Sequence, residues 1–266
     1  MKRCIHIAVA LIALATLAVG ATWAVDLTDG LVGLWPFNDG AGVVARDSSG
    51  LGNHGTVLGS AFFTTDPQMG GVLQVDGVSG SVVVPHNASL EPATGTIMVW
   101  VKPARVQTAD LVSKNTDYLV RRNQVYTIYA YCLRISKNGA PVALLTSDDP
   151  SAEYAWTYLE GPKGQVKAGQ WSHLAMRWDG SSLSLFVNGK LVAAKSYSAI
   201  PNSGLSYAGN LDLKVAAAIW DFDDGWLEFT GQLAGLRLFG RALSEAEINA
   251  AYSSSAPAQA KGSAKR

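Results

Sequence analysis

The chain has 266 residues, of which 48% are hydrophobic, and its 21 basic side chains balance its 21 acidic ones. This balance excludes the strongly basic face typical of nucleic-acid-binding proteins. The length and apolar content are sufficient for one large core without disulfide bonds.

The N-terminal segment resembles a secretory signal. Lys2 and Arg3 precede an apolar run at 5–19, which small residues follow at 20–24. Because the run is shorter than the ~20 residues that span a bilayer, it favours a cleaved signal over a membrane anchor. We predict that residues 1–24 are removed and that the mature protein is secreted, periplasmic or at the cell surface, without a membrane span.

Removal of this segment also removes Cys4, which leaves Cys132 as the single cysteine of the mature chain. No intrachain disulfide is then available, so the exported domain must be held together by packing, either alone or with a metal. We expect Cys132 to be a buried, small apolar residue.

Alternation of apolar and polar residues, interrupted by turn residues, dominates the rest of the chain. The spacing is typical of an antiparallel sandwich and not of strands alternating with helices. The predicted strands are 31–37, 72–75, 81–84, 96–102, 110–114, 118–121, 125–135, 140–145, 153–158, 171–178, 183–187, 190–195, 212–217 and 229–239.

Three tight connections are predicted between these strands. Asn138-Gly139 and Asn188-Gly189 each separate two strands, and both residues of such a pair tolerate the positive φ of a type I′ hairpin turn. Asp179-Gly180 marks the third connection.

One short helix is expected at the C-terminal end, over 244–252. Ser244 is placed to cap it and Glu247 to complete a capping box, with Ile248 and Ala251 facing the edge of the sandwich. The remaining residues, 253–266, are small or polar, and we expect them to be a disordered tail.

Several segments together resemble the laminin-G-like jelly-roll domain of the concanavalin A-like lectin/glucanase superfamily. They are GLVGLWPFNDGAG at 30–42, DSSGLGNHG at 47–55, WSHLAMRWDG at 171–180, LFVNGKLV at 185–192 and FTGQLAGLRLFGRALSEAEI at 229–248. The resemblance implies an all-β, two-sheet jelly roll over 31–252, after a linker at 25–30, whose first and last strands pair. It also implies that Trp35, Trp100, Trp171 and Trp178 are structural core residues in strands, and that the His173 ring is structural, packed and bonded inside the sheet.

The resemblance further implies glycan binding, often beside a calcium ion. Asp39, Asp47 and Asn53 offer oxygen atoms on a glycine-rich loop, as calcium prefers. However, the family's acidic residues in the last strand are replaced here by Ala234 and Gly235. The alternative is that Asp47 only binds backbone amides in a turn.

Aromatic side chains provide the strongest indication of a sugar-binding site, because their rings stack on the C–H faces of sugars. Tyr154, Trp156 and Tyr158 alternate, so an extended strand places all three on one face. A second group comprises Trp220 and Trp226, which flank an acidic segment expected to be a loop and containing Asp221, Asp223 and Asp224. The alternative is that three or four of these rings belong to the core.

Catalytic motifs are missing from the sequence. Glycosidases on this fold carry paired acids at alternate positions of one strand, and no Glu-x-Asp-x-x-Glu motif, zinc-ligand cluster or nucleophile elbow occurs here. The favoured hypothesis is an exported, non-catalytic module that binds a glycan or a cell-surface glycoconjugate. The alternatives are a glycoside hydrolase or polysaccharide lyase on the same fold, and a surface module that adheres to another protein.

Overall fold

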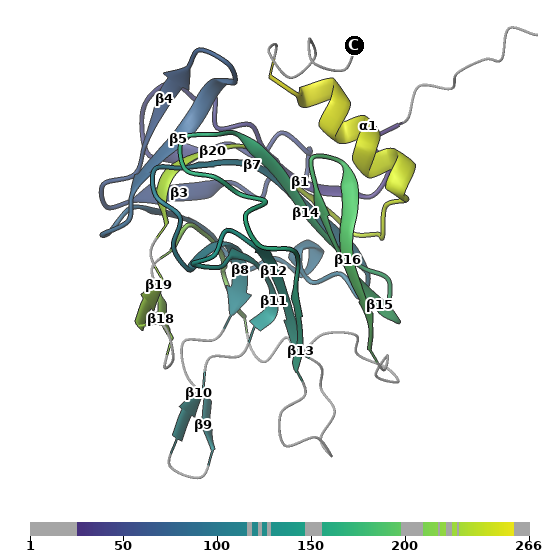
Figure 1. The fold of residues 1–266 in the computed structure, drawn as a ribbon. Coiled ribbons are helices and arrows are strands. Elements are labelled where there is room, and N and C mark those ends of the chain that lie inside the picture. The colour runs from purple at the N-terminus through teal and green to yellow at the C-terminus, as the bar shows by residue number, and fades with distance from the viewer. Residues whose placement is uncertain are drawn as a thin grey trace, which may run out of the picture.

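The computed structural model describes residues 26–115, 119–121, 124–126, 129–146, 156–197, 210–217, 219–221, 225–227 and 229–257. Two antiparallel β-sheets pack face to face, and one α-helix covers the outer side of one of them (Figure 1). The predicted all-β, two-sheet architecture with a C-terminal helix is confirmed.

Sheet A carries the helix. Its strands lie in the spatial order β16 (Lys190–Ser196), β15 (Ser182–Val187), β14 (Ser172–Trp178), β7 (Gly95–Pro103), β20 (Thr230–Phe239), β5 (Gly70–Asp76) and β4 (Phe62–Asp66), with β1 (Leu31–Trp35) also paired to β20. The first strand thus pairs with the last, as the resemblance implied. Thr230–Leu233 of β20 pair with β5, and Leu236–Phe239 pair with β1.

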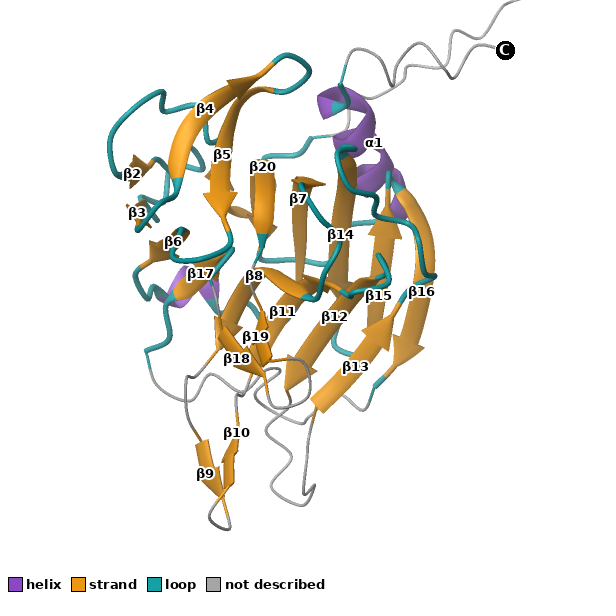
Figure 2. Cartoon of the chain, turned by 60° about the vertical axis from the view of Figure 1, so that its left-hand side comes forward, coloured by secondary structure: helices purple, strands orange, loops and turns teal. Residues whose placement is uncertain are grey.

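Sheet B forms the opposite layer. Its order is β13 (Trp156–Glu160), β12 (Pro141–Thr146), β11 (Tyr129–Ile135), β8 (Ala109–Asn115), β17 (Leu213–Val215), β6 (Ser81–Val84), β3 (Gly55–Leu58) and β2 (Val44–Ala45). Two separate hairpins, β9 (Leu119–Arg121) with β10 (Gln124–Tyr126) and β18 (Ile219–Asp221) with β19 (Gly225–Leu227), lie on the side of the molecule away from the helix (Figures 1 and 2). A short 3₁₀ helix, η1, spans Ala88–Leu90.

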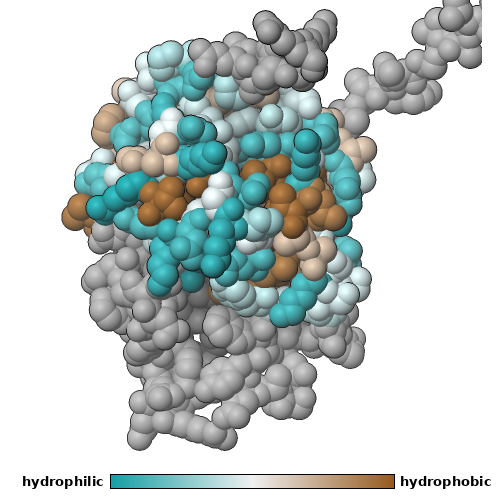
Figure 3. Space-filling model, in the orientation of Figure 1, coloured by the Kyte–Doolittle hydropathy of each residue, from teal (hydrophilic) through white to brown (hydrophobic). Residues whose placement is uncertain are grey.

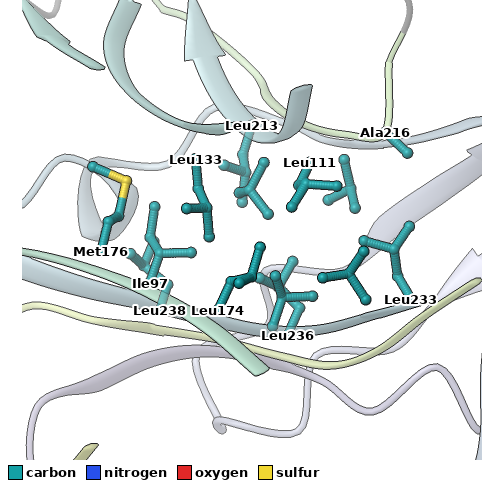
Figure 4. Packing of buried hydrophobic residues seen from close by; sticks show 14 of the residues in the cluster. Ile97, Leu111, Leu133, Leu174, Met176, Leu213, Ala216, Leu233, Leu236 and Leu238 are labelled. Carbon is teal, nitrogen blue, oxygen red and sulfur yellow. The ribbon is translucent and has the colours of Figure 1, made fainter. Parts of the chain in front are cut away.

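The core lies between the two sheets. Figure 4 shows Leu111, Leu133 and Leu213 of sheet B meeting Ile97, Leu174 and Leu236 of sheet A. All six side chains are at most 1% exposed. Removal of this apolar area from water is the main driving force for folding of the sandwich. Because successive side chains of a strand point to opposite faces of its sheet, every second side chain points into the core.

Trp35 and Trp178 are buried members of the core. Trp35 donates its Nε1–H to the carbonyl of Asn53 at 2.8 Å. The Trp178 ring stacks on that of Tyr131, with centroids 5.4 Å apart. Trp100 is also buried, on the outer face of sheet A, so three of the four tryptophans predicted to be structural are core residues.

Trp171 does not follow that prediction. It precedes β14 instead of belonging to it, and it is only partly buried. Its Nε1–H donates to Asp66 Oδ1 at 3.1 Å, so a buried carboxylate fixes the ring.

The C-terminal helix, α1, spans Glu245–Ser255 and has the predicted capping box. The Ser244 hydroxyl accepts the Glu247 amide, while the Glu247 carboxylate accepts the Ser244 amide. Ile248 and Ala251 are buried against the outer face of sheet A, and not at the sandwich edge as predicted. The helix continues three residues beyond the predicted end, so residues 253–255 are helical and not part of a disordered tail.

Two of the predicted turns have the expected chemistry and one differs. Asn188 and Gly189 have φ of 50° and 75°, as a type I′ turn requires. Asp179 Oδ1 accepts the amides of Ser181 and Ser182. At the other hairpin only Gly139 has positive φ, and the Gly139 amide donates to the Ser136 carbonyl. That loop is therefore a longer turn ending in a left-handed glycine.

Several strand boundaries depart from the predictions. The expected strand at 125–135 is divided between β10 and β11, and the segment around residues 221–226, expected to be a loop, contains β18 and β19. Strands β2, β3 and β4 were not predicted. They have two, four and five residues, which is too short to show a clear alternation. Strand β2 pairs with β3 and β4 with β5, their neighbours in the chain, whereas β3 also pairs with the more distant β6.

In the described part of the chain, α1 is too short and too polar to span a bilayer. The predicted signal segment, residues 1–24, lies outside the described residues.

Candidate functional site

The outer face of sheet B is the first place where predicted site residues meet. Across this face the strand register aligns Tyr158 with Leu144, Leu144 with Cys132, and Cys132 with Ser113. These residues alternate along their strands with core residues such as Leu133, so they point away from the core.

A second row on the same face is charged. The register aligns Glu160 with Val142, Val142 with Arg134, and Arg134 with Asp110. Arg134 Nε donates to Asp110 Oδ1 at 2.6 Å, and the two side chains are 7% and 1% exposed. A buried charge requires a partner to offset its lost hydration, and each side chain of this pair supplies that partner to the other.

Cys132 lies beside the ion pair. It is fully buried with Val142 and Leu144 in a small apolar cluster. Burial, reinforced by the nearby Asp110 charge, raises the pKa of its thiol well above the ordinary value. The thiol is therefore protonated at neutral pH and lacks thiolate nucleophilicity, which confirms the predicted buried cysteine.

Tyr158 is an exposed aromatic residue of this face. It belongs to β13, the edge strand of sheet B, and is 41% exposed. Its hydroxyl donates to Glu160 Oε2 at 3.1 Å, and Lys195 Nζ of the neighbouring β16 donates to its carbonyl. These contacts place an aromatic ring beside a carboxylate and an ammonium group.

The other predicted ligand residues are less completely described. Trp156 pairs with Thr146 at the start of β13, and Trp220 pairs with Trp226 across the β18–β19 hairpin, with Asp221 opposite Gly225. These backbone pairings bring the two tryptophan positions together. Tyr154, Asp223 and Asp224 lie outside the described residues.

The predicted metal residues form a hydrogen-bonded turn. Asp47 Oδ1 accepts the amides of Leu34 and Ser49, and Oδ2 accepts the Ser49 hydroxyl and the Asn53 amide, all within 2.9 Å. These bonds outweigh the opposing effect of burial and lower the pKa of Asp47. Four donors directed at one carboxylate favour the turn interpretation.

The other two members of the predicted metal set are not arranged around Asp47 as cation ligands. Asp39 is paired with Arg46 at 3.4 Å. The Asn53 amide group donates to the Val32 carbonyl and to Ser89, while its Oδ1 is buried and has no hydrogen-bond partner among the described residues. In the described part of the chain, no group of three or more His, Cys, Asp or Glu residues is placed to hold a metal. This donor set does not fit calcium in the observed conformation.

Catalysis by a carboxylate pair is also disfavoured on the described face. Glycosidase carboxyl groups lie about 5–9.5 Å apart. Asp110 and Glu160 occupy the same row but are separated by three strand intervals, which is about 14 Å at the usual interstrand spacing. Asp110 is also held by Arg134.

Sequence reasoning did not identify Asp110, Arg134 or Glu160 as members of the site. Each polar residue alternates with apolar core positions in its strand. That alternation was visible in the sequence and indicated an outward orientation. Their alignment in one row depends on the pairing of strands far apart in the chain.

Comparison with known proteins supports the observed architecture. Residues 76–249 match the family model described as the concanavalin A-like lectin/glucanases superfamily. A 92-residue segment is 39% identical to mouse pentraxin-related protein PTX3, covering 32% of this chain and 23% of that protein. The chain thus aligns with about a quarter of this relative's length.

Solved structures share the fold at low sequence identity. The binding domain of Paraclostridial Mosquitocidal Protein 1 has a TM-score of 0.64 at 16% identity, over 86% of this chain and 53% of that one. Domain 4 of AbnA, a GH43 extracellular arabinanase from Geobacillus stearothermophilus solved with arabinotriose, has a TM-score of 0.58 at 18% identity, over 82% and 96%.

A third similar structure is the binding domain of Botulinum Neurotoxin DC in complex with SialylT, with a TM-score of 0.60 at 12% identity over 86% and 52% of the two chains. At these identities the structural likeness establishes the fold alone, while the family model extends over most of the sandwich. The chain belongs to the concanavalin A-like lectin/glucanases superfamily.

Proposed function

We propose that this protein is an exported, non-catalytic module that binds carbohydrate at the β13 edge of the outer face of sheet B, where Tyr158 and Glu160 are exposed. The proposal rests on the position of Tyr158. This residue is 41% exposed on an edge strand of that face, and its hydroxyl is bonded to Glu160. An exposed aromatic face stacks on the C–H groups of a sugar, and adjacent polar groups bind its hydroxyls.

The similar proteins support this class of ligand. The arabinanase domain was solved with arabinotriose, and the neurotoxin binding domain with SialylT. Binding, and not hydrolysis, fits the described face of sheet B, because its two carboxylates are too far apart to act as a glycosidase pair. Export is proposed from the sequence of residues 1–24.

The stacking role of Tyr158 is testable by single substitutions. Tyr158→Ala removes the ring, whereas Tyr158→Phe keeps the ring and removes the bond to Glu160. Leu191→Ala is a control of matched exposure, at 42%, on a strand of sheet A. Binding is measured by affinity electrophoresis through gels containing arabinan, xylan or mannan, together with a glycan array and melting curves.

We expect Tyr158→Ala to weaken binding about tenfold, as loss of roughly 1.4 kcal/mol from an aromatic contact implies. Tyr158→Phe is expected to keep most of the affinity and Leu191→Ala all of it, with unchanged melting temperatures. If Tyr158→Ala binds every recognised glycan like wild type, the proposed site is wrong. Retention by a protein partner that survives glycosidase treatment, with no glycan bound, would favour the adhesion alternative.

A further inference from the structure

A row of five side chains crosses the outer face of sheet A. The register aligns Phe62 of β4 with Gln74 of β5, Gln74 with Gln232 of β20, and Gln232 with Lys102 of β7. Trp171, which directly precedes β14, continues this row, and Lys102 Nζ lies 5.8 Å from its ring centroid. We call these five residues the amide row.

The amide row points away from the core. Gln74, Gln232 and Lys102 alternate with fully buried core residues such as Leu73 and Leu233. Phe62 is 53% exposed, and the other four are partly exposed. In Figure 1, α1 lies over the part of sheet A near β14 and β16, whereas β4 and β5 lie beyond the helix.

A buried carboxylate holds the Trp171 end of the row in place. Asp66, whose side chain is 3% exposed, accepts Trp171 Nε1 through Oδ1 and Lys102 Nζ through Oδ2, at 3.1 and 2.9 Å. The amides of Gln68 and Met69 also donate to Oδ1. The indole is therefore oriented before any ligand arrives, which reduces the entropy lost on binding.

The centre of the row contains an unused acceptor. Gln232 Oε1 is buried and has no hydrogen-bond partner among the described residues. Beside it, Gln74 Nε2 donates to the carbonyl of Gly231 at 3.1 Å. A buried polar atom without a partner is unfavourable. Because Gln232 as a residue is partly exposed, rotation of its side chain would bring this acceptor to the surface, where a ligand hydroxyl would supply the missing bond.

In the view of Figure 3, the described surface is mainly hydrophilic, with apolar residues in small separate patches. The row itself has aromatic rings at its two ends and polar groups between them. This composition is suited to a ligand with alternating C–H faces and hydroxyls, and less to an apolar protein interface.

We propose that the amide row is a second carbohydrate-binding surface, which takes an uncharged polysaccharide chain lying across the strands. Five strand positions extend over about 19 Å at the usual interstrand spacing, so one chain can contact both rings. An uncharged ligand is favoured because the Lys102 charge is paired with Asp66. The proposal rests on the proposed carbohydrate-binding function but uses the opposite sheet.

The test uses the full mature chain with the substitutions Phe62→Ala, Gln232→Leu and Trp171→Phe. Gln232→Leu keeps the size of the side chain and removes the unpartnered acceptor, so the fold should be preserved. Leu191→Ala serves as the control on sheet A, and Tyr158→Ala reports on the site of sheet B. Each variant is run through gels containing arabinan, xylan, mannan or the acidic polysaccharide polygalacturonate, and its melting curve is recorded.

We expect Gln232→Leu and Phe62→Ala each to weaken binding to a neutral polysaccharide about tenfold, equivalent to roughly 1.4 kcal/mol, with unchanged melting temperatures. If the gels retard both variants as strongly as wild type while Tyr158→Ala loses binding, the amide row is not a binding surface. The proposed function would then remain intact. Binding of polygalacturonate alone would overturn the neutral ligand class. A wild-type protein that no gel retards would overturn both proposals.

Discussion

The burial of His173 predicts a measurable loss of stability in acid. The residue is 1% exposed, and neither ring nitrogen has a hydrogen-bond partner in the part of the chain that the structure describes. The Trp100 ring packs against it with centroids 5.2 Å apart, and Tyr252 of α1 lies at 5.9 Å. Burial, aided by the positive charge of Arg237, lowers the pKa of His173 from 6.5 to about 3.

The sign of the effect follows from proton uptake. Between pH 6.5 and about 3, His173 is protonated in the unfolded chain but neutral in the folded one. The free energy of unfolding therefore falls as the pH falls through this window, by roughly 1.4 kcal/mol per pH unit. At pH 4.5 the contribution of this one residue is a loss of roughly 3 kcal/mol relative to pH 7.

The substitution His173→Phe isolates the contribution of His173 to the pH dependence of stability. His173→Leu is a second variant, used in case the larger phenyl ring packs poorly. Neither substitution removes the hydrogen bond between the His173 amide and Asn188 Oδ1. Urea unfolding of wild type and variants is measured at pH 7 and pH 4.5. Carboxylates whose pKa is lowered, such as Asp47 and Glu247, titrate in all three proteins and cancel in the comparison.

We expect the wild type to lose roughly 3 kcal/mol more than either variant between the two pH values, because only the wild type must keep an uncharged imidazole. If wild type and both variants lose the same free energy, the imidazole is not held neutral in the folded state and the reasoning is wrong.

Three further predictions concern the core, the Asp47 turn and the N-terminus. Trp100→Ala is expected to destabilise the fold by about 3–5 kcal/mol, and Trp171→Ala by clearly less because Trp171 is only partly buried; equal losses in urea unfolding would contradict this ranking. Chelator should leave the melting temperature unchanged, since the Asp47 carboxylate already accepts four donors, whereas a fall reversed by calcium would show that this loop binds the ion. Intact mass of exported protein should begin at Val25, and retention of Met1 would exclude cleavage.

The sequence by itself determined the local features of this protein. Alternation predicted β14 and β15 within one residue at either end, because a strand half-facing a core must place apolar residues at every second position. Asn188-Gly189 predicted its turn, because few other residues tolerate positive φ at both positions. Ser244 and Glu247 likewise predicted the start of α1, since their bonds involve only neighbouring residues.

Only the tertiary structure decided which distant residues share a face. Asp110 and Arg134 became an ion pair because β8 and β11 pair in one particular register. Trp171, predicted as core, became a surface ring because Asp66, 105 residues away in sequence, binds its Nε1–H. The strength of such contacts depends on sheet register and burial, which a linear pattern does not encode, so the candidate surfaces of both sheets emerged only once the strands were placed side by side.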